Sequence, residues 1–159
     1  MRLLVGSDHA GISLRRAIAR HLLAGGHPDI TEAEEVGPGD GERVDYPDPA
    51  LAVASVVVSA SAASPALGIL ICGSGIGMSI AANKVVGIRA ALVHDPVTAR
   101  LAAEHNGANV LCLGGRLLAE PYALELVDTW LAARFDARHQ QRLDKIAAIE
   151  FNRPLTQAG

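Results

Sequence analysis

Short apolar runs alternate with segments of helical length along most of the chain. The runs are rich in Val, Leu and Ile, a composition that favours buried strands. This rhythm predicts a single three-layer α/β/α sandwich, with a five-stranded, parallel, doubly wound sheet of the Rossmann-like or flavodoxin-like kind. Strands are predicted at 2–7, 29–37, 67–73, 87–94 and 108–115, and helices at 11–24, 48–63, 76–85, 95–106 and 119–134.

Three segments fit the alternation less well. The second predicted strand contains TEAEE, which is also typical of a helix. A final helical segment at about 137–152 has no strand to return to, so we expect it to pack on a partner subunit. The segment GPGDGERVDYPDP (37–49) is the one long loop, and loops of this length are often functional.

Composition narrows the class of protein. The chain has 159 residues, which suits one domain spanning 1–159, and 50% of them are hydrophobic but only 3% aromatic. A net charge of -3 gives no electrostatic case for nucleic acid or a membrane surface, and no apolar run approaches the roughly 20 residues that span a bilayer. Two cysteines are no disulfide framework, and no leader pattern opens the chain. We expect a cytoplasmic protein that acts on a small molecule, with both thiols free.

Polar residues follow several of the predicted strands. In an open parallel sheet, ligands bind outside the carboxyl ends of the strands, so these residues are the candidates for a site. They are Ser7, Asp8 and His9 after the first strand, Cys72, Gly73 and Ser74 after the third, His94 and Asp95 after the fourth, and Gly114, Gly115 and Arg116 after the fifth.

The glycine-rich turn after the third strand fits neither common nucleotide motif. Its glycines are Gly73, Gly75 and Gly77, and Met78 stands where a dinucleotide fingerprint needs Gly or Ala. No Gly-Lys-Ser/Thr follows at the spacing of a Walker loop. What remains is a turn that opens a helix and presents backbone N–H groups to an anion.

Cys72 stands immediately before this turn. The field of the turn favours a thiolate there, which can act as a nucleophile or a base. The alternative is a small buried residue that ends a strand. We assign that structural role to Cys112, which lies between Leu111 and Leu113 inside the fifth predicted strand.

Six separated motifs together resemble the ribose-5-phosphate isomerase B family, within a wider group that includes galactose-6-phosphate and allose-6-phosphate isomerases. The resemblance runs in order from residue 2 to about 150. The motifs are GSDHAG (6–11), DYPD (45–48), CGSGIGMSIAANK (72–84), GIRAAL (87–92), EHNGANVLCLGGR (104–116) and RHQQRLDKIAAIE (138–150).

The resemblance implies an aldose–ketose isomerase without a cofactor, and no spacing of His, Cys and Asp residues in the sequence suggests a metal site. Such an enzyme moves a proton between C2 and C1 of an open-chain sugar phosphate through a cis-enediolate. The family's base is a cysteine in one branch and a glutamate in another, and this chain has Cys72 in the first place and Met78 in the second. The enediolate oxygens would then lie against the Gly73–Gly77 turn, with Ser74 as a hydroxyl donor.

The resemblance also implies the remaining roles. His105 opens the sugar ring, and Asn106 and Asp8 bind sugar oxygens. The catalytic set is therefore Cys72, His105, Ser74 and Asp8; the substrate-binding set is Asp8, His9, Tyr46, Gly73, Ser74, Gly75, Gly77 and Asn106; the phosphate-binding set is His9, Arg116, Arg138 and Arg142, with His139 as a possible neighbour.

The predicted site residues do not all fall at the same end of the sheet. His105 and Asn106 end a crossover helix, so within one chain they lie at the opposite pole of the sheet from Cys72. We therefore hypothesise a site shared across a homodimer, which can pair further into a tetramer. Arg138 and Arg142 are four residues apart and can converge on one phosphate, although such a pair is usually a solvated helix face. His21, His27 and His94 are expected to be ordinary surface residues.

Two other functions stay open at this point. The loop at 37–44 is richer in Gly and Pro than the resemblance leads us to expect, near where the sugar would be held. The substrate can therefore be a six-carbon or four-carbon aldose phosphate, such as allose 6-phosphate, galactose 6-phosphate or erythrose 4-phosphate. A non-catalytic sensor of phosphorylated ligands would need the turn and the arginines but no base.

Overall fold

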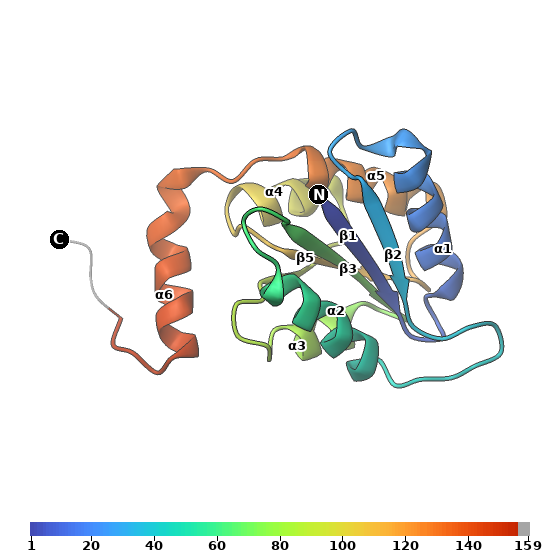
Figure 1. Ribbon diagram of the computed structural model, residues 1–159, viewed down its shortest axis with the longest axis horizontal. Helices are drawn as coiled ribbons and strands as arrows, with labels where there is room; N and C mark the ends of the chain where they lie inside the picture. Colours follow the sequence, from blue (N-terminus) through green and yellow to red (C-terminus); the bar gives the residue numbers. More distant parts are fainter. Residues whose placement is uncertain (156–159) are drawn as a thin grey trace.

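The computed structural model describes residues 1–155; residues 156–159, which the predicted domain includes, lie outside the described part. Five parallel strands form one sheet in the order β2-β1-β3-β5-β4 (Figure 1). This confirms the predicted α/β class and sheet. The strands are β1 (Arg2–Ser7), β2 (Glu32–Val36), β3 (Ala66–Cys72), β4 (Ala90–Leu92) and β5 (Val110–Gly114).

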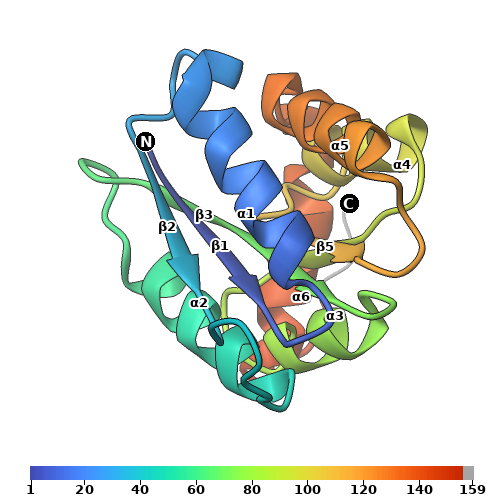
Figure 2. The ribbon, with the colours of Figure 1, turned by 90° about the vertical axis from the view of Figure 1, so that its right-hand side faces the viewer.

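Helices cover both faces of the sheet, as Figure 2 shows. One layer holds α1, α4 and α5, and the other holds α2 and α3. This arrangement follows from right-handed crossovers between parallel strands. The helices are α1 (Ile12–His21), α2 (Pro47–Ser59), α3 (Ile76–Ala82), α4 (Pro96–Glu104) and α5 (Glu120–Ala132).

Alternation along the central strands divides the core in two. Ile69 and Ile71 of β3 face the α1, α4 and α5 layer, whereas Leu70 and Cys72 face α2 and α3. Both faces are covered, so the central strands read as unbroken apolar runs. Small aliphatic side chains fill this core, which explains the few aromatic residues.

The second predicted strand is shorter in the structure than the expected 29–37, since β2 spans only Glu32–Val36. Its side chains are mostly exposed because β2 pairs only with β1 and forms one edge of the sheet. Its glutamates therefore reach solvent, and Glu34 pairs with Arg2 of the neighbouring strand. Backbone pairing of Leu3 with Ala33 overrides the helical tendency of TEAEE. Strand β4, on the opposite edge, is likewise shorter than the predicted 87–94.

Several helix ends also differ from the prediction. Helix α1 ends at His21 and continues as a π-helical turn, Leu22–Gly26, in which Gly25 has φ +92°. The predicted helix at 137–152 is a 3-10 turn, Ala137–His139, followed by α6 (Gln140–Glu150).

Helix α6 lies to one side of the sheet and its helices (Figure 1), and the carboxylate of its last residue, Glu150, accepts a hydrogen bond from the backbone N–H of Gly87 at 3.0 Å. None of its residues is buried, and Ile146 and Ile149 are exposed, as is Phe151 just beyond it. Of the helices within residues 1–155, none is long and apolar enough to cross a membrane.

Candidate active site

A cavity of about 390 Å³ lies at the carboxyl ends of the central strands. Every residue that lines it, apart from Leu117, belongs to the set singled out from the sequence. The lining consists of Asp8, Tyr46, Cys72, Gly73, Ser74, Gly77, Arg116 and Leu117. A larger cavity of about 510 Å³ lies at the opposite ends of the strands, but Arg2 with serine and alanine side chains dominates its wall and it holds none of the predicted chemistry.

Cys72 ends β3 and is 4% exposed. Its sulfur accepts a hydrogen bond from the backbone N–H of Gly75 at 3.1 Å. The turn that delivers this donor requires glycine, because Gly75 has φ +78° and an added Cβ would lie 2.5 Å from Leu92 Cδ1. The donor is placed to stabilise negative charge on the sulfur.

The loop after β5 is tied directly to the glycine turn. The backbone N–H of Gly115 donates to the carbonyl of Cys72 at 2.8 Å, and that of Arg116 donates to the carbonyl of Gly73 at 3.1 Å. A Cβ on Gly73 would stand 3.4 Å from Arg116 Nη1, so the guanidinium lies over the bare backbone of this glycine. These contacts place a fixed positive charge in the wall of the cavity.

Two backbone N–H groups of the turn already have partners. Gly75 donates to the Cys72 sulfur, and Ile76 donates to the hydroxyl oxygen of Ser74 at 3.3 Å. The expectation that the whole turn is free to receive an anion is therefore too broad. The Ser74 hydroxyl is held at the mouth of the turn and lines the cavity.

Asp8 and Tyr46 form further walls. Asp8 is buried, and its carboxylate accepts a hydrogen bond from the backbone N–H of Ala10 at 2.8 Å. Tyr46 immediately precedes α2, and a Cβ on Gly77 would come within 2.8 Å of its ring. The ring thus packs against the backbone of Gly77 and closes one side of the cavity.

His9 follows Asp8 but points to the long loop. Its Nδ1 is 3.3 Å from the carbonyl oxygen of Val44, and its Nε2 is 3.4 Å from Nη2 of Arg43. Because a carbonyl can only accept, we assign the ring proton to Nδ1, which leaves Nε2 to accept from Arg43.

A second group of basic residues surrounds the 3-10 turn before α6. His139 is 5% exposed, and its ring centroid lies 4.3 Å from that of His105. Arg142 Nη1 is 2.8 Å from His139 Nδ1, and Arg138 Nε is 3.2 Å from His139 Nε2. Burial, followed by the neighbouring His105, Arg142 and Arg138, lowers the pKa of His139.

This second group does not line the Cys72 cavity in the described part of the chain. His105 follows the end of α4, and Asn106 lines a separate cavity of about 160 Å³ together with Ile146 of α6. The structure therefore brings Asp8, Tyr46, Cys72, Ser74 and Arg116 together. It leaves His105, Asn106, Arg138 and Arg142 elsewhere in the same chain.

Sequence reasoning missed three residues near the site. Leu117 follows Arg116 after β5, so the strand-end rule that found Arg116 could have included it. Arg43 lies in the long loop flagged as functional, and only its contact with His9 sets it apart. Arg15 shows no signal in sequence, because its burial depends on three segments distant from it.

Comparison with known proteins gives consistent matches over nearly the full chain. A family model described as Ribose/Galactose Isomerase matches residues 3–146. Ribose-5-phosphate isomerase B of Escherichia coli (strain K12) is 42% identical over 153 residues, covering 96% of this chain and 98% of the relative. Ribose-5-phosphate isomerase B of Mycobacterium leprae (strain TN) is also 42% identical, covering 94% of this chain and 90% of the relative.

Solved structures agree with the sequence matches. A ribose-5-phosphate isomerase B from Clostridium thermocellum superposes with a TM-score of 0.87 at 46% identity, covering 96% of this chain and 99% of that one. A type B ribose 5-phosphate isomerase from Trypanosoma brucei gives a TM-score of 0.85 at 45% identity, covering 93% and 97% of the two chains.

Proposed function

The chain belongs to the ribose/galactose isomerase family, and from that membership and the Cys72 cavity we propose that it interconverts D-ribose 5-phosphate and D-ribulose 5-phosphate. The observation that carries the proposal is the sulfur of Cys72, which meets a backbone N–H donor at the edge of a cavity that also holds a carboxylate, a hydroxyl and a guanidinium. That set is what proton transfer on a phosphorylated sugar needs.

The proposed reaction is a proton transfer with Cys72 as base. The thiolate removes the proton from C2 of the open-chain aldose, which leaves a cis-enediolate and a thiol. The hydroxyl proton passes from O2 to O1, and the thiol returns its proton to C1, which gives the ketose and restores the thiolate. The Ser74 hydroxyl and backbone N–H groups of the 73–77 turn donate hydrogen bonds to the enediolate oxygens. Asp8 binds the sugar hydroxyls and Arg116 holds the phosphate. His9 joins Arg116 through Nε2, which donates to the phosphate in the doubly protonated form of the ring and in place of its 3.4 Å contact with Arg43, while Nδ1 keeps the carbonyl of Val44.

Ring opening and the rest of the phosphate site are proposed to come from a second copy of the chain. His105, Asn106, Arg138 and Arg142 are away from Cys72 within one chain, and α6 leaves Ile146 and Ile149 exposed. A homodimer that places these groups of one copy at the Cys72 cavity of the other would complete the site. The reaction as proposed uses only side-chain and backbone groups, and we place it in the cytoplasm, where the two free thiols would stay reduced.

The experiment that tests this function is turnover of ribose 5-phosphate by the purified protein. We expect conversion to ribulose 5-phosphate, loss of that conversion in Cys72→Ala, and near wild-type turnover in Cys112→Ala, which truncates the other buried cysteine. Binding without turnover would indicate the phospho-ligand sensor. Turnover of six-carbon or four-carbon aldose phosphates in preference to ribose 5-phosphate would replace the substrate but keep the reaction.

A further inference from the structure

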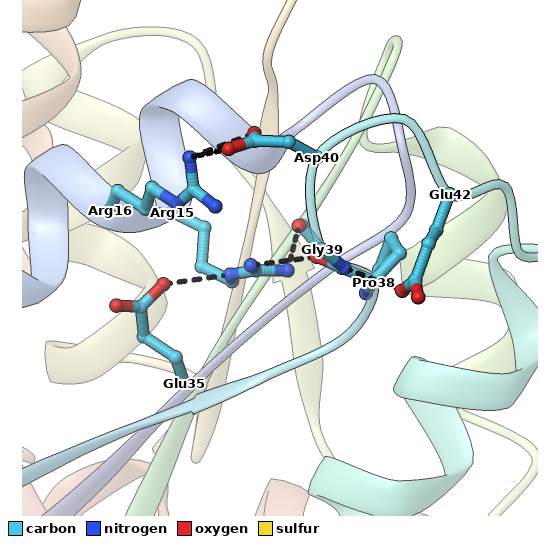
Figure 3. Close-up of polar contacts among 8 residues, drawn as sticks. Arg15, Arg16, Glu35, Pro38, Gly39, Asp40 and Glu42 are labelled. Carbon is cyan, nitrogen blue, oxygen red and sulfur yellow. Dashed lines mark hydrogen bonds and ion pairs between the residues drawn. The ribbon is translucent and has the colours of Figure 1, made fainter.

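Arg15 of α1 carries a buried guanidinium. Its side chain is 5% exposed, and all three of its nitrogen atoms have partners. Nε donates to Glu35 Oε2 and Nη2 to the carbonyl of Pro38, both at 2.9 Å (Figure 3). Nη1 donates to Ser7 Oγ, also at 2.9 Å. A buried charge is tolerated only when it is paired in this way. One side chain therefore joins the end of β1, β2 and the start of the long loop.

The start of loop 37–44 lies directly on this guanidinium. Gly37 has φ +131°, and a Cβ there would collide with the carbonyl oxygen of Ser7 and lie 2.7 Å from Arg15 Nη1. The backbone of the loop is thus seated between β1 and Arg15, at a distance that only glycine allows.

Two more polar contacts hold the middle of the loop, as Figure 3 shows. Arg16 Nη1 donates to both carboxylate oxygens of Asp40, at 2.8 and 3.0 Å. Glu42 accepts from the backbone N–H of Gly39 at 2.8 Å. Adjacent arginines of α1 therefore fix the loop at its start and in its middle.

The far end of the same loop fixes His9. Both ring nitrogens of His9 meet loop residues, Nδ1 the carbonyl of Val44 and Nε2 the guanidinium of Arg43. Tyr46, in the wall of the cavity, follows two residues later. The orientation of the His9 ring thus depends on where loop 37–44 is held.

We propose that Arg15 is a positioning residue for phosphate binding: it seats loop 37–44, and the loop orients His9 through Val44 and Arg43. This inference rests on the proposed function, in which His9 holds the substrate phosphate. A lysine would keep the charge but cannot reproduce the planar fork that reaches three segments at once.

The test begins with Arg15→Lys and, as a matched control, Arg20→Lys on the exposed side of the same helix. We expect Arg15→Lys to raise KM for ribose 5-phosphate about tenfold, the effect of one charge-assisted hydrogen bond, while kcat changes less than about twofold. Arg20→Lys should leave both unchanged. An unchanged KM in a folded Arg15→Lys protein would overturn the proposal.

A double-mutant cycle with His9→Ala separates positioning from a general effect on the fold. If Arg15 acts through His9, Arg15→Lys should raise KM much less in the His9→Ala background, while its effect on Tm stays the same in both. Equal fold-changes in KM in both backgrounds would show that Arg15 does not act through His9. If Arg15→Lys fails to fold, Asp40→Ala replaces it as the test. This variant removes the exposed contact between Arg16 and Asp40 that holds the middle of the loop, and it should raise KM for ribose 5-phosphate by about twofold.

The same cycle distinguishes this inference from the proposed function. Calorimetry gives Kd for ribose 5-phosphate without any need for turnover. Coupled effects on Kd in a protein that does not turn the sugar over would support the role of Arg15 and overturn the isomerase activity. Turnover of ribose 5-phosphate with independent effects of the two substitutions on Kd would support the isomerase activity and overturn the role of Arg15. A protein that does not bind ribose 5-phosphate would overturn both the activity and the role of Arg15.

Discussion

The imidazole rings of His105 and His139 lie with their centroids 4.3 Å apart and their planes tilted by 39°. One ring follows the end of α4 and the other belongs to the 3-10 turn before α6. The guanidinium groups of Arg138 and Arg142 approach the two nitrogens of His139. Burial of the ring lowers the pKa of His139, and the neighbouring His105, Arg142 and Arg138 lower it further, so this position disfavours the charged form of the histidine.

The first prediction concerns the pH dependence of stability. The folded-state pKa of His139 lies below its ordinary value of 6.5, so the unfolded chain binds more protons as the pH falls through that value. The contribution of His139 to the free energy of unfolding is therefore fully present above about pH 6.5 and is lost as the pH falls below that value. In Tm measurements between pH 8 and 5, roughly the range in which histidines titrate, we expect His139→Gln to show a smaller decline than wild type.

His94→Gln serves as the control, because His94 is exposed two residues beyond the end of β4. It should retain the full pH dependence. Parallel Tm profiles for wild type and His139→Gln would contradict the assigned role of His139.

A second prediction concerns the turn that supports Cys72. Gly75→Ala and Gly41→Ala both place a side chain at positive φ, +78° and +81°, but Gly41 has open space around it. Gly41→Ala should cost only backbone strain, about 1–2 kcal/mol. Gly75→Ala should cost about 1–3 kcal/mol more, because its Cβ would meet Leu92 and Leu113. Urea unfolding of both variants measures the difference, and equal losses of stability would show that the turn can relax.

A third prediction separates the two cysteines by reactivity. Cys72 lines the cavity, whereas Cys112 lies inside β5 and burial raises the pKa of its thiol. In the native protein iodoacetamide should modify Cys72, and ribose 5-phosphate should slow that reaction. Mass spectrometry should find modified Cys112 only after unfolding. A native Cys72→Ala protein should stay unlabelled, and rapid labelling of its Cys112 would show that β5 opens more readily than its burial indicates.

The fourth prediction tests the shared site. Cys72→Ala and His105→Ala should each be inactive as homodimers. In a hybrid dimer one site would carry both changes and the other neither. Equal mixing makes about half of the dimers hybrids, and each hybrid has one intact site of two, so the mixture should show about a quarter of wild-type activity. A mixture that stays inactive, after hybrid formation has been verified with two affinity tags, would show that Cys72 and His105 do not come from different subunits.

Local pattern was enough to predict the sheet and much of the cavity. A parallel sheet with crossover helices brings the carboxyl ends of its strands to one edge, so the sequence alone is enough to group Asp8, Cys72, Ser74 and Arg116. The chain positions of His105 and Asn106 likewise predicted that they lie away from Cys72. These predictions depend only on which residues end which elements.

Tertiary structure decided what distant segments do to one another. TEAEE is a strand because β1 supplies its hydrogen-bond partners, and propensity within five residues cannot report that. The burial of Arg15, the seating of Gly37 and the orientation of His9 by Val44 each depend on contacts between separate elements. Sequence pattern determined which groups reach the site, because that follows from chain order. Their orientation followed only from packing, because it is set by atoms far apart along the chain.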